Sequence, residues 1–339
     1  MKKVAILGST GSIGRAALEI AEAGRGDIEI VGLSAGGNVD ELAKQLDLFP
    51  RALFTLGRGD DLARMTSRHP SLASRSRGTG HEGIEALIAE TRPDLVVNAL
   101  VGIAGFAPTV AALEAGCAVA LANKESLVSG GRIVMDIVRG RPDMIIPVDS
   151  EHFSLSRCLC GNRADTTELV LTASGGPFFK RDRRDLERVT VEEALNHPTW
   201  RMGRKVTIDS ANLLNKGMEV MEARWLFDVT PETISVNIHP QSIIHSMVEY
   251  VDGCVIAQLG TPDMKAPIAY ALSYPQRVSS RVRPLDLTEL CGLSFFKPDL
   301  ERFPCLALAY RALGEGESMP AVMNAANEVA VEAFLAGRI

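Results

Sequence analysis

The sequence predicts an α/β protein that begins with a doubly wound parallel sheet, continues into an α+β domain and ends in a short helical segment. Over roughly the first 150 residues, apolar runs of strand length alternate with amphipathic stretches of helical length, which is typical of a parallel sheet covered by helices. The first apolar run, Val4-Ala5-Ile6-Leu7, leads into a glycine-rich turn. After residue 150 the alternation stops, and two runs around Asp252-Gly253 indicate an antiparallel hairpin.

Within the first domain we expect five parallel strands and five helices. The strands are expected at 4–7, 28–33, 94–99, 118–122 and 144–148. The helices are expected from 15 to about 23 and near 39–48, 82–90, 106–115 and 125–139. We therefore assign residues 1–149 to this domain.

The remaining residues divide into three predicted parts. Residues 150–273 form a second, connective domain, with strands at 169–172, 242–251 and 254–260. The Pro- and Arg-rich stretch 274–300 is expected to be a linker, and 301–339 a helical end. The last helix has an apolar stripe, which we expect to pack on the central domain or on a second subunit. The stripe comprises Val322, Ala326, Val329, Ala330 and Ala333.

Composition limits the class of protein. The chain has 339 residues, 46% of them hydrophobic and 23% charged, as in a soluble globular protein. The net charge of −6 argues against a general nucleic-acid partner, and no apolar run approaches the roughly 20 residues of a membrane span. The six cysteines, at 117, 158, 160, 254, 291 and 305, form no Cys-x-x-Cys pair. We expect a cytoplasmic protein with no membrane partner.

The glycine turn predicts a dinucleotide site in a Rossmann-like domain. Gly8-Ser9-Thr10-Gly11-Ser12-Ile13-Gly14 lies between a strand and a helix, where glycines let the backbone approach a pyrophosphate and the helix N-terminus offers free N–H groups. The segment after the second strand, 34–38, has no carboxylate. NADP is therefore favoured over NAD, although no cation follows that strand to bind a 2′-phosphate.

A group of acidic residues predicts a metal site. Asp149 and Glu151 follow the apolar run 144–146, and on extended backbone they would project to the same side. Glu219 and Glu222 would share one face of a helix. Carboxylate oxygens suit a hard divalent cation. Alternatively, Asp149 caps a helix whose first turn contains Glu151, and spacing alone fits this interpretation at least as well.

Three further segments have residues suited to ligands. Lys124 follows a strand and opens a helix, a position that disfavours a purely solvated cation. The glycine turn 173–177 suits an anion. Residues 197–203 combine Trp200 with turn formers, which is consistent with a lid or, equally, with a core tryptophan beside a turn.

Eight motifs in order resemble the 1-deoxy-D-xylulose 5-phosphate reductoisomerase family over the whole chain. The motifs lie at 8–14, 122–128, 147–152, 174–178, 197–200, 215–217, 239–242 and 324–328. The resemblance implies an NADPH- and metal-dependent oxidoreductase. Its implied reaction converts 1-deoxy-D-xylulose 5-phosphate to 2-C-methyl-D-erythritol 4-phosphate, in non-mevalonate isoprenoid synthesis, by cleavage and re-formation of a carbon–carbon bond followed by hydride transfer.

The resemblance also implies roles for individual residues. Metal ligands, for Mg²⁺ or Mn²⁺ with Co²⁺ as a further candidate, would be Asp149, Glu151 and Glu219. Catalytic residues would be Lys124, Glu151 and His152. Substrate would be bound by Lys124, Ser150, Glu151, Ser174, His197, Ser210, Asn215, Lys216 and Glu219. Cofactor would be lined by Gly8, Thr10, Gly11, Ser12, Ile13, Gly36, Gly37, Asn38, Asn123, Glu125 and Gly203.

The chain departs from the family pattern at three places. Gly37 stands where members usually have Lys or Arg, which predicts weaker discrimination of NADP, and Phe153 stands where they usually have Asn. Members also continue past residue 339 into a helical bundle, so we expect a truncated or unusually small C-terminal segment. A homodimer built through the strands of the central domain is expected from the resemblance.

Two other functions fit part of the sequence. An oxidoreductase of the same architecture could act on a different phosphorylated or acidic carbonyl compound, and Phe153 is the residue that favours it. A binding protein that senses NADP would keep the first domain and lose the chemistry. The retained acidic residues and the glycine turn after 173 argue against that sensor.

Overall fold

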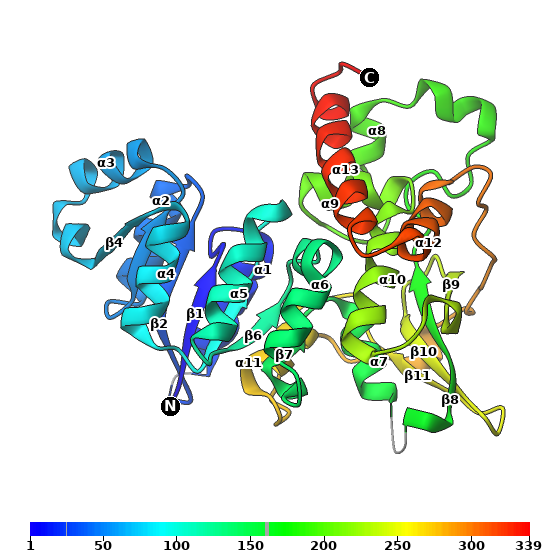
Figure 1. The fold of residues 1–339 in the computed structure, drawn as a ribbon, viewed down its shortest axis with the longest axis horizontal. Coiled ribbons are helices and arrows are strands. Elements are labelled where there is room, and N and C mark those ends of the chain that lie inside the picture. The colour runs from blue at the N-terminus through cyan, green and yellow to red at the C-terminus, as the bar shows by residue number, and fades with distance from the viewer. Residues whose placement is uncertain (25, 160–162) are drawn as a thin grey trace. The chain divides into compact units, whose positions relative to one another are not determined.

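The computed structural model describes residues 1–24, 26–159 and 163–339. These residues form two compact units, which Figure 1 traces from the N-terminus to the C-terminus. Unit 1 comprises Met1–Ser126, Ile133–Asp149 and Met264–Arg281, and unit 2 comprises Leu127–Arg132, Ser150–Asp263 and Val282–Ile339. Of the six cysteines, Cys160 lies outside the described residues, and the other five are free thiols.

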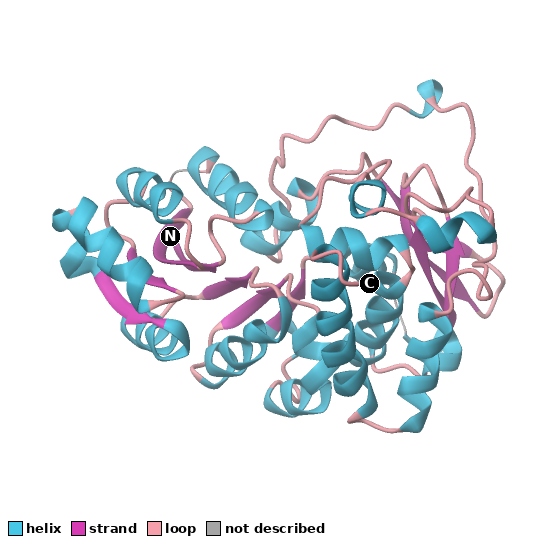
Figure 2. Ribbon diagram, turned by 90° about the horizontal axis from the view of Figure 1, so that it is seen from above, coloured by secondary structure: helices cyan, strands magenta, loops and turns pink. Residues whose placement is uncertain are grey.

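Unit 1 is a seven-stranded parallel sheet with helices on both faces, as Figure 2 shows. Its strands are β1 (Lys2–Leu7), β2 (Ile28–Ala35), β3 (Leu53–Leu56), β4 (Ser76–Thr79), β5 (Leu95–Asn98), β6 (Ala118–Leu121) and β7 (Ile145–Pro147), in the order β4-β3-β2-β1-β5-β6-β7. Its helices are α1 (Ser12–Ala23), α2 (Val39–Leu48), α3 (Gly59–Arg68), α4 (Gly80–Thr91), α5 (Phe106–Glu114), most of α6 (Glu125–Ile137) and α11 (Lys265–Ser273). The predicted Rossmann-like fold is confirmed.

The order of the strands places a topological switch point beside β1. The chain moves outward from β1 to β4 on one side, and then returns to place β5 on the other side of β1. Residues Val4 to Leu7 are fully buried between these neighbours. In open α/β sheets, ligands bind beyond the carboxyl ends of the strands at such a point, and the glycine turn after β1 occupies it.

Four helices and strands of unit 1 were not predicted, and one of them lies in residues that were assigned to the second domain. The strands β3 and β4 have only four residues each, and α3 begins at Gly59, within the stretch Gly57-Arg58-Gly59 that resembles a loop. Residues 265–273, predicted as part of the second domain, form α11. This helix belongs to unit 1 because it packs on α1, where Lys265 and Glu19 also form an ion pair at 2.7 Å.

Unit 2 contains a four-stranded mixed sheet in the order β11-β10-β8-β9. Its strands are β8 (Thr166–Ala173), β9 (Ile234–Ile238), β10 (Ile244–Tyr250) and β11 (Val255–Leu259). Its helices are α7 (Ser150–Cys158), α8 (Val191–Leu195), α9 (Arg204–Ala211), α10 (Leu214–Phe227), α12 (Cys305–Glu315) and α13 (Met319–Leu335). The predicted hairpin at Asp252-Gly253 is confirmed, with the Gly253 N–H donating to the Tyr250 carbonyl at 2.8 Å.

One prediction about unit 2 is wrong, and one of the two alternatives of another is excluded. Glu151 lies in the first turn of α7 and not on extended backbone, so its alternation with Asp149 does not apply and the helix of the alternative interpretation is present. The apolar stripe of α13 does not pack on the central domain, since Val322 and Val329 are 56% and 68% exposed; packing on a second subunit stays a prediction. The buried face of α13 instead includes Asn324 and Asn327, because both amides make hydrogen bonds there.

Among the residues that the structure describes, no helix has both the length and the apolar character needed to span a membrane.

Candidate active site

The turn after β1 is shaped to receive an anion. Gly8 has a φ of +84°, and a Cβ there would lie 2.6 Å from the Ala99 carbonyl oxygen, so only glycine allows this approach between neighbouring strand ends. Gly11 precedes α1 without any side-chain cap, and the first turn of α1 has no acidic residue. The first N–H groups of α1 are thus available to a phosphate. Of the predicted cofactor residues here, Gly11 and Ser12 are exposed, while Thr10 and Ile13 are half-buried.

The segment after β2 is held by α3. Gly36 and Asn38 are exposed, and the Asn38 side chain caps α2 by accepting a hydrogen bond from the Glu41 N–H at 3.3 Å. The Gly37 carbonyl accepts a hydrogen bond from Arg64 at 2.8 Å. A cation therefore lies beside this segment, which contradicts the sequence-based view that none does.

Asn123, predicted to line the cofactor, organises the loop that follows β5. Its amide nitrogen donates to the carbonyls of Leu100 and Gly102 at 3.0 and 2.9 Å and to the Glu125 carboxylate at 3.0 Å. Its oxygen accepts from the Ser126 N–H. Asn123 is 1% exposed, so the structure gives it a positioning role within unit 1.

Lys124 and Asp149 form an ion pair in unit 1. The Lys124 Nζ donates to Asp149 Oδ2, and the two side chains are only 9% and 17% exposed. Lys124 precedes α6 and Asp149 follows β7, so both lie at carboxyl ends of adjacent strands. The lysine compensates the carboxylate that was predicted to bind metal.

In unit 2, one ammonium group joins two of the predicted carboxylates. The Lys216 Nζ donates to Glu151 Oε1 at 2.8 Å and also to Glu219 Oε2, while Asn215 donates to Glu219 Oε1 at 2.5 Å. Lys216 and Glu219 are nearly inaccessible to solvent, and Glu151 is partly accessible. Residues 215, 216 and 219 come from the first turns of α10, whereas Glu151 comes from α7.

Charge compensation keeps this cluster ionised. Burial alone would raise the pKa of Glu151, but the Lys216 ammonium, together with hydrogen bonds from Lys216 and Ser150, lowers that pKa to about 2. Burial would likewise lower the pKa of Lys216, but Glu151 and Glu219 raise it. The Ser150 hydroxyl donates to Glu151 Oε2 at 2.7 Å, so both oxygens of Glu151 are oriented.

His152, predicted as catalytic, is turned into unit 2. It is 1% exposed, and its Nε2 lies 2.9 Å from the backbone carbonyl oxygen of Glu219. Its ring contacts Phe227, with centroids 6.4 Å apart. This contact fixes α7 against α10 at the level of Glu219.

A second glycine turn, after β8, lies against α9. Gly175 and Gly176 have φ values of +85° and +71°, and a Cβ on Gly176 would lie 2.6 Å from the Ser210 carbonyl oxygen. Two consecutive glycines therefore allow the turn to approach Ser210. The predicted phosphate residues Ser174 and Ser210 are thus brought together, with Asn215 and Lys216 following α9 on α10.

His197 is linked to this turn through Ser174. The N–H groups of Thr199 and Trp200 donate to His197 Nδ1 at 3.2 and 2.9 Å, so in the neutral ring the proton is on Nε2. Nε2 then donates to the Ser174 hydroxyl at 2.9 Å. Burial lowers the pKa of His197, which favours this neutral form. The other predicted loop residue, Gly203, is exposed and directly precedes α9.

Sequence reasoning missed His245. It lies on β10 and is 7% exposed, and its pKa is lowered by burial and raised less strongly by the charge of Glu151. Its ring lies 6.0 Å from that of Trp200. A single histidine within a strand resembles a core residue, and only its proximity in space to Glu151 and Trp200 distinguishes it.

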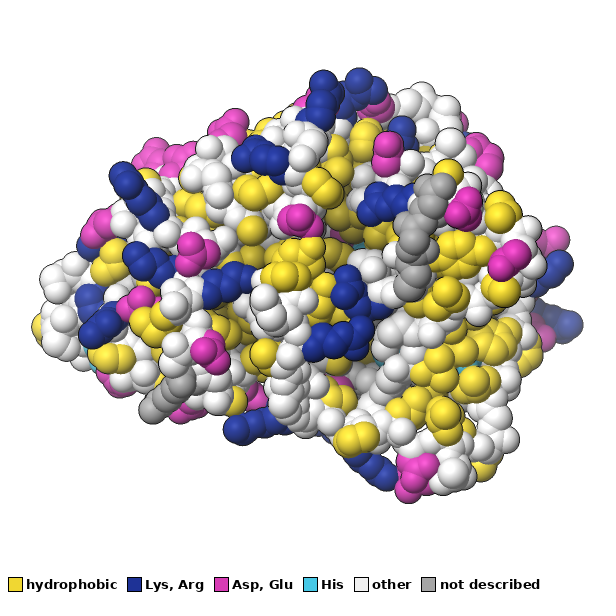
Figure 3. All heavy atoms as spheres, turned by 90° about the horizontal axis from the view of Figure 1, so that it is seen from below, with side chains coloured by type: hydrophobic (Ala, Val, Ile, Leu, Met, Phe, Trp, Pro, Cys, Tyr) yellow, Lys and Arg dark blue, Asp and Glu magenta, His cyan; other side chains and the backbone are white. Residues whose placement is uncertain are grey.

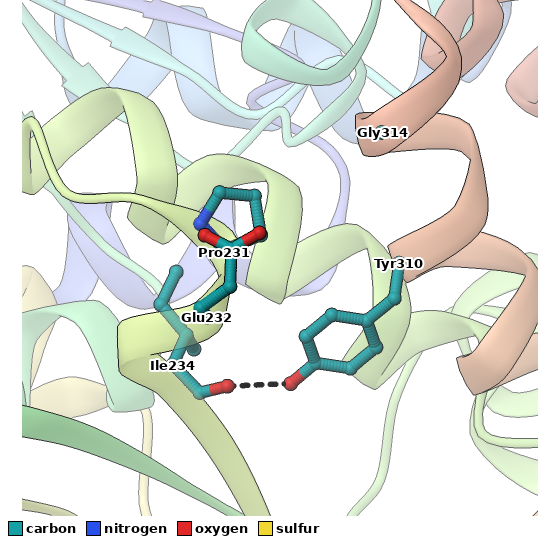
Figure 4. Close-up of a pocket in the computed structure, with 5 residues that line it drawn as sticks. All are labelled: Pro231, Glu232, Ile234, Tyr310 and Gly314. Carbon is teal, nitrogen blue, oxygen red and sulfur yellow. Dashed lines mark hydrogen bonds between the residues drawn. The ribbon is translucent and has the colours of Figure 1, made fainter.

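A separate small pocket of unit 2 is not a candidate for the active site. Pro231, Glu232, Ile234, Tyr310 and Gly314 line it (Figure 4). The Tyr310 hydroxyl donates to the Ile234 carbonyl at 2.8 Å, and burial together with Glu168 raises the pKa of Tyr310 to about 12. A neutral tyrosine already bonded to the backbone is not a candidate for catalysis.

The fold of unit 1 and the buried acid–lysine cluster of unit 2 define an oxidoreductase of the dinucleotide-binding class. Three sequence models identify the particular family. The model described as 1-deoxy-D-xylulose 5-phosphate reductoisomerase matches residues 4–131. Models of the C-terminal domains of that enzyme match residues 145–227 and 259–339.

Individual proteins give the same result. The 1-deoxy-D-xylulose 5-phosphate reductoisomerase of Trichlorobacter lovleyi is 59% identical over 340 residues, which cover 100% of this chain and 87% of that protein. That of Chlorobium phaeobacteroides is 50% identical over 344 residues, covering 100% and 88%. The chain belongs to the 1-deoxy-D-xylulose 5-phosphate reductoisomerase family, and the resemblance deduced from its motifs is confirmed.

Solved structures agree in fold. A crystal structure of DOX-P reductoisomerase in complex with NADPH, fosmidomycin and magnesium superimposes with a TM-score of 0.95 at 42% identity, covering 100% of this chain and 86% of the other. The enzyme from Zymomonas mobilis in complex with NADPH gives a TM-score of 0.90 at 39% identity, covering 100% and 88%.

Proposed function

We propose that this protein catalyses the NADPH- and divalent-metal-dependent isomerisation and reduction of 1-deoxy-D-xylulose 5-phosphate to 2-C-methyl-D-erythritol 4-phosphate. The observation that carries the proposal is the arrangement of Glu151 and Glu219 around one cation, the Lys216 ammonium. It occurs in a unit that also contains the Ser174 glycine turn, in a chain belonging to the reductoisomerase family.

Unit 1 has residues that fit NADPH. The uncapped N-terminus of α1 and the tight Gly8 turn would receive the pyrophosphate. No carboxylate occurs in the sequence between Ser34 and Asn38, where NAD enzymes place an acid on the ribose. Lining of the cofactor by Thr10 to Ile13, Gly36 to Asn38 and Gly203 is part of this proposal.

The acidic residues fit a hard divalent cation. Oxygens of Glu151 and Glu219 already converge on a positive charge, and Asp149 lies two residues before Glu151. Such oxygen donors suit Mg²⁺ or Mn²⁺. We assign metal binding to Asp149, Glu151 and Glu219. When bound, the divalent cation supplies Lewis-acid stabilisation of oxygen anions and NADPH supplies the hydride.

The protein's own residues would bind and orient the substrate. Ser174, Ser210, Asn215 and Lys216 would hold the phosphate, with the His197 N–H on Nε2 directed at Ser174. Binding energy from this remote group would orient the reacting end near Lys124, Ser150 and Glu151. Glu151 has a lowered pKa and is therefore ionised, so its oxygens can accept a hydrogen bond from a substrate hydroxyl. A role for Glu151 in moving a proton is part of this proposal.

His152 is better described as a positioning residue. Its Nε2 contacts the Glu219 carbonyl and its ring packs on Phe227, so it would act by holding Glu219 and not by touching substrate.

Glu219→Gln tests the metal assignment. It should abolish most turnover and weaken the response to Mg²⁺, while NADPH binding, measured by fluorescence, stays within about twofold. Glu232→Gln, at the pocket without chemistry, is the matched control. Metal-independent turnover by wild-type protein would refute the assignment. Turnover of another phosphorylated carbonyl substrate in place of this one would support the rival oxidoreductase.

We further propose a cytoplasmic homodimer formed through unit 2. The edge strand β11 is exposed, with Val255, Ile256 and Leu259 at 54%, 39% and 38%. Hydrophobic side chains gather on the underside of unit 2 in Figure 3, and an exposed apolar edge strand favours association. Val255→Lys should shift the sedimentation coefficient from dimer to monomer at unchanged circular dichroism. A wild-type monomer at micromolar concentration would contradict the dimer.

A further inference from the structure

The end of β2 is flanked by two arginines that the sequence pattern does not place there. Arg58 precedes α3 and Arg64 lies within it, more than twenty residues after Gly37. Arg64 Nη2 donates to the Gly37 carbonyl at 2.8 Å, and the Gly57 N–H donates to the Gly36 carbonyl at 2.9 Å. The segment after β3 is thus joined directly to the turn after β2.

A carboxylate holds both arginines. Asp61 Oδ1 accepts from Arg64 Nη2 at 2.8 Å, and Asp61 Oδ2 lies 3.5 Å from Arg58 Nε. The Asp61 side chain is 9% exposed, whereas those of Arg58 and Arg64 are 83% and 46% exposed. The trio carries a net positive charge, and the guanidinium groups provide its solvent-accessible part.

The Asp61 carboxylate also leaves little room for a side chain at position 37. A Cβ on Gly37 would lie 3.0 Å from Asp61 Oδ2, so a longer side chain would begin against the carboxylate that orients the arginines.

We propose that Arg58 and Arg64 form the subsite for the 2′-phosphate of NADPH, with Asp61 as the residue that positions them. This rests on the proposed use of NADPH. In a doubly wound sheet the ribose of a dinucleotide lies at the end of the second strand, beside Gly37. Guanidinium groups suit a phosphate dianion because several N–H groups in one plane can donate to its oxygens. The two arginines thus provide the preference for NADPH over NADH that a basic residue at position 37 would otherwise provide.

The opposite assignment is that Asp61 itself accepts a ribose hydroxyl, which would favour NADH. The structure argues against it, because Asp61 Oδ1 accepts a hydrogen bond from Arg64, and Oδ2, 3.5 Å from Arg58 Nε, is buried from solvent.

Adenosine 2′,5′-bisphosphate and adenosine 5′-monophosphate differ only in the 2′-phosphate, so their affinities measure the contribution of that phosphate to binding. Calorimetry would compare both nucleotides, and fluorescence would compare NADPH with NADH, on the full chain. Each of Arg58→Gln and Arg64→Gln should weaken the bisphosphate and NADPH about tenfold, and the double variant more. The monophosphate and NADH should change less than about twofold. Arg51→Gln removes the same charge from an 82% exposed side chain paired with Glu29, and it should alter none of these constants.

The outcomes separate the two proposals. Unchanged NADPH affinity in the double variant, with normal NADPH binding by wild-type protein, would overturn the arginine subsite and leave the proposed function standing. Failure of wild-type protein to bind NADPH would overturn both. Asp61→Asn should weaken NADPH and leave NADH unchanged, and a selective loss of NADH instead would establish the opposite assignment.

Discussion

The Nζ of Lys216 lies 2.8 Å from Oε1 of Glu151, although the two residues are 65 positions apart and come from different helices. The same Nζ is bonded to Glu219, so two carboxylates share one buried ammonium and the three groups keep a net negative charge. A buried cluster of this kind is stable only while its charges are compensated. Replacing the Lys216 ammonium, or adding a divalent cation, should therefore change the stability of the fold.

Removing the ammonium should make the fold depend on metal. Lys216→Met leaves Glu151 and Glu219 facing each other without a cation, which should lower the free energy of unfolding by about 3–5 kcal/mol in the presence of chelator. Saturating Mg²⁺ should raise the Tm of this variant more than that of wild-type protein. Lys265→Met, which breaks a more exposed pair with Glu19, should show neither effect. An equal rise in Tm with Mg²⁺ in both variants would show that loss of the Lys216 ammonium does not make the fold depend on metal.

The lowered pKa of Glu151 predicts a specific dependence of stability on pH. The ordinary pKa is 4.5 and the folded-state pKa is about 2, so ionised Glu151 stabilises the fold above about pH 4.5. This contribution is lost as the pH falls towards 2. The difference in unfolding free energy between wild-type protein and Glu151→Gln should shrink on acidification from about pH 5 to 3. Chemical denaturation at each pH measures it, and a constant difference would contradict the pKa assignment.

Trp200 should contribute more to turnover than to stability. Trp200 is half-buried. Its backbone N–H donates to His197 Nδ1, and its ring lies near that of His245. Trp200→Ala should destabilise the protein by less than the roughly 3–5 kcal/mol of a core tryptophan, yet reduce turnover strongly. In a Trp225→Phe background, which removes the only other tryptophan, Trp200 fluorescence should change when a phosphonate substrate mimic and Mg²⁺ bind. A full core penalty with no fluorescence change would restore the interpretation of Trp200 as a core residue.

The C-terminal helix should support the phosphate site. Asn327 Nδ2 donates to Asp209 at 2.9 Å, Lys205 donates to the other Asp209 oxygen, and Ser210 is the next residue. Asn327→Ala should cost about 1.5–3 kcal/mol of stability and raise the KM for the phosphorylated substrate more than it lowers kcat. Val322→Ser, on the exposed face of the same helix, should stay within about 0.5 kcal/mol of wild type. An unchanged KM in the Asn327 variant would show that the bond is purely structural.

The sequence was sufficient for the parts of the fold that have strong local patterns. The Gly8 turn, the buried strands at its sides and the Asp252-Gly253 hairpin are determined by neighbouring residues. The four-residue strands β3 and β4 lack enough residues to show a period. The buried face of α13 was not predicted, because the hydrogen-bonded burial of Asn324 and Asn327 has no apolar signature.

Prediction of the site was limited because contacts between residues far apart in the sequence leave no local pattern. Glu151, Lys216 and Glu219 were identified from motifs. Only the structure shows that the two glutamates share the Lys216 ammonium. His245 lacks a distinguishing sequence pattern. Arg58 and Arg64 lie in a segment whose helix was not predicted, so the cation beside Gly37 could not be foreseen.

The central claim is reductoisomerase activity at the Glu151–Glu219 cluster, and the most direct test follows NADPH consumption with 1-deoxy-D-xylulose 5-phosphate at varied metal. Wild-type protein should consume NADPH only when Mg²⁺ or Mn²⁺ is present, lose activity in chelator and regain it when either cation is restored. NADPH consumption unaffected by chelator, or NADPH binding with no turnover of this substrate at any metal concentration, would contradict the claim.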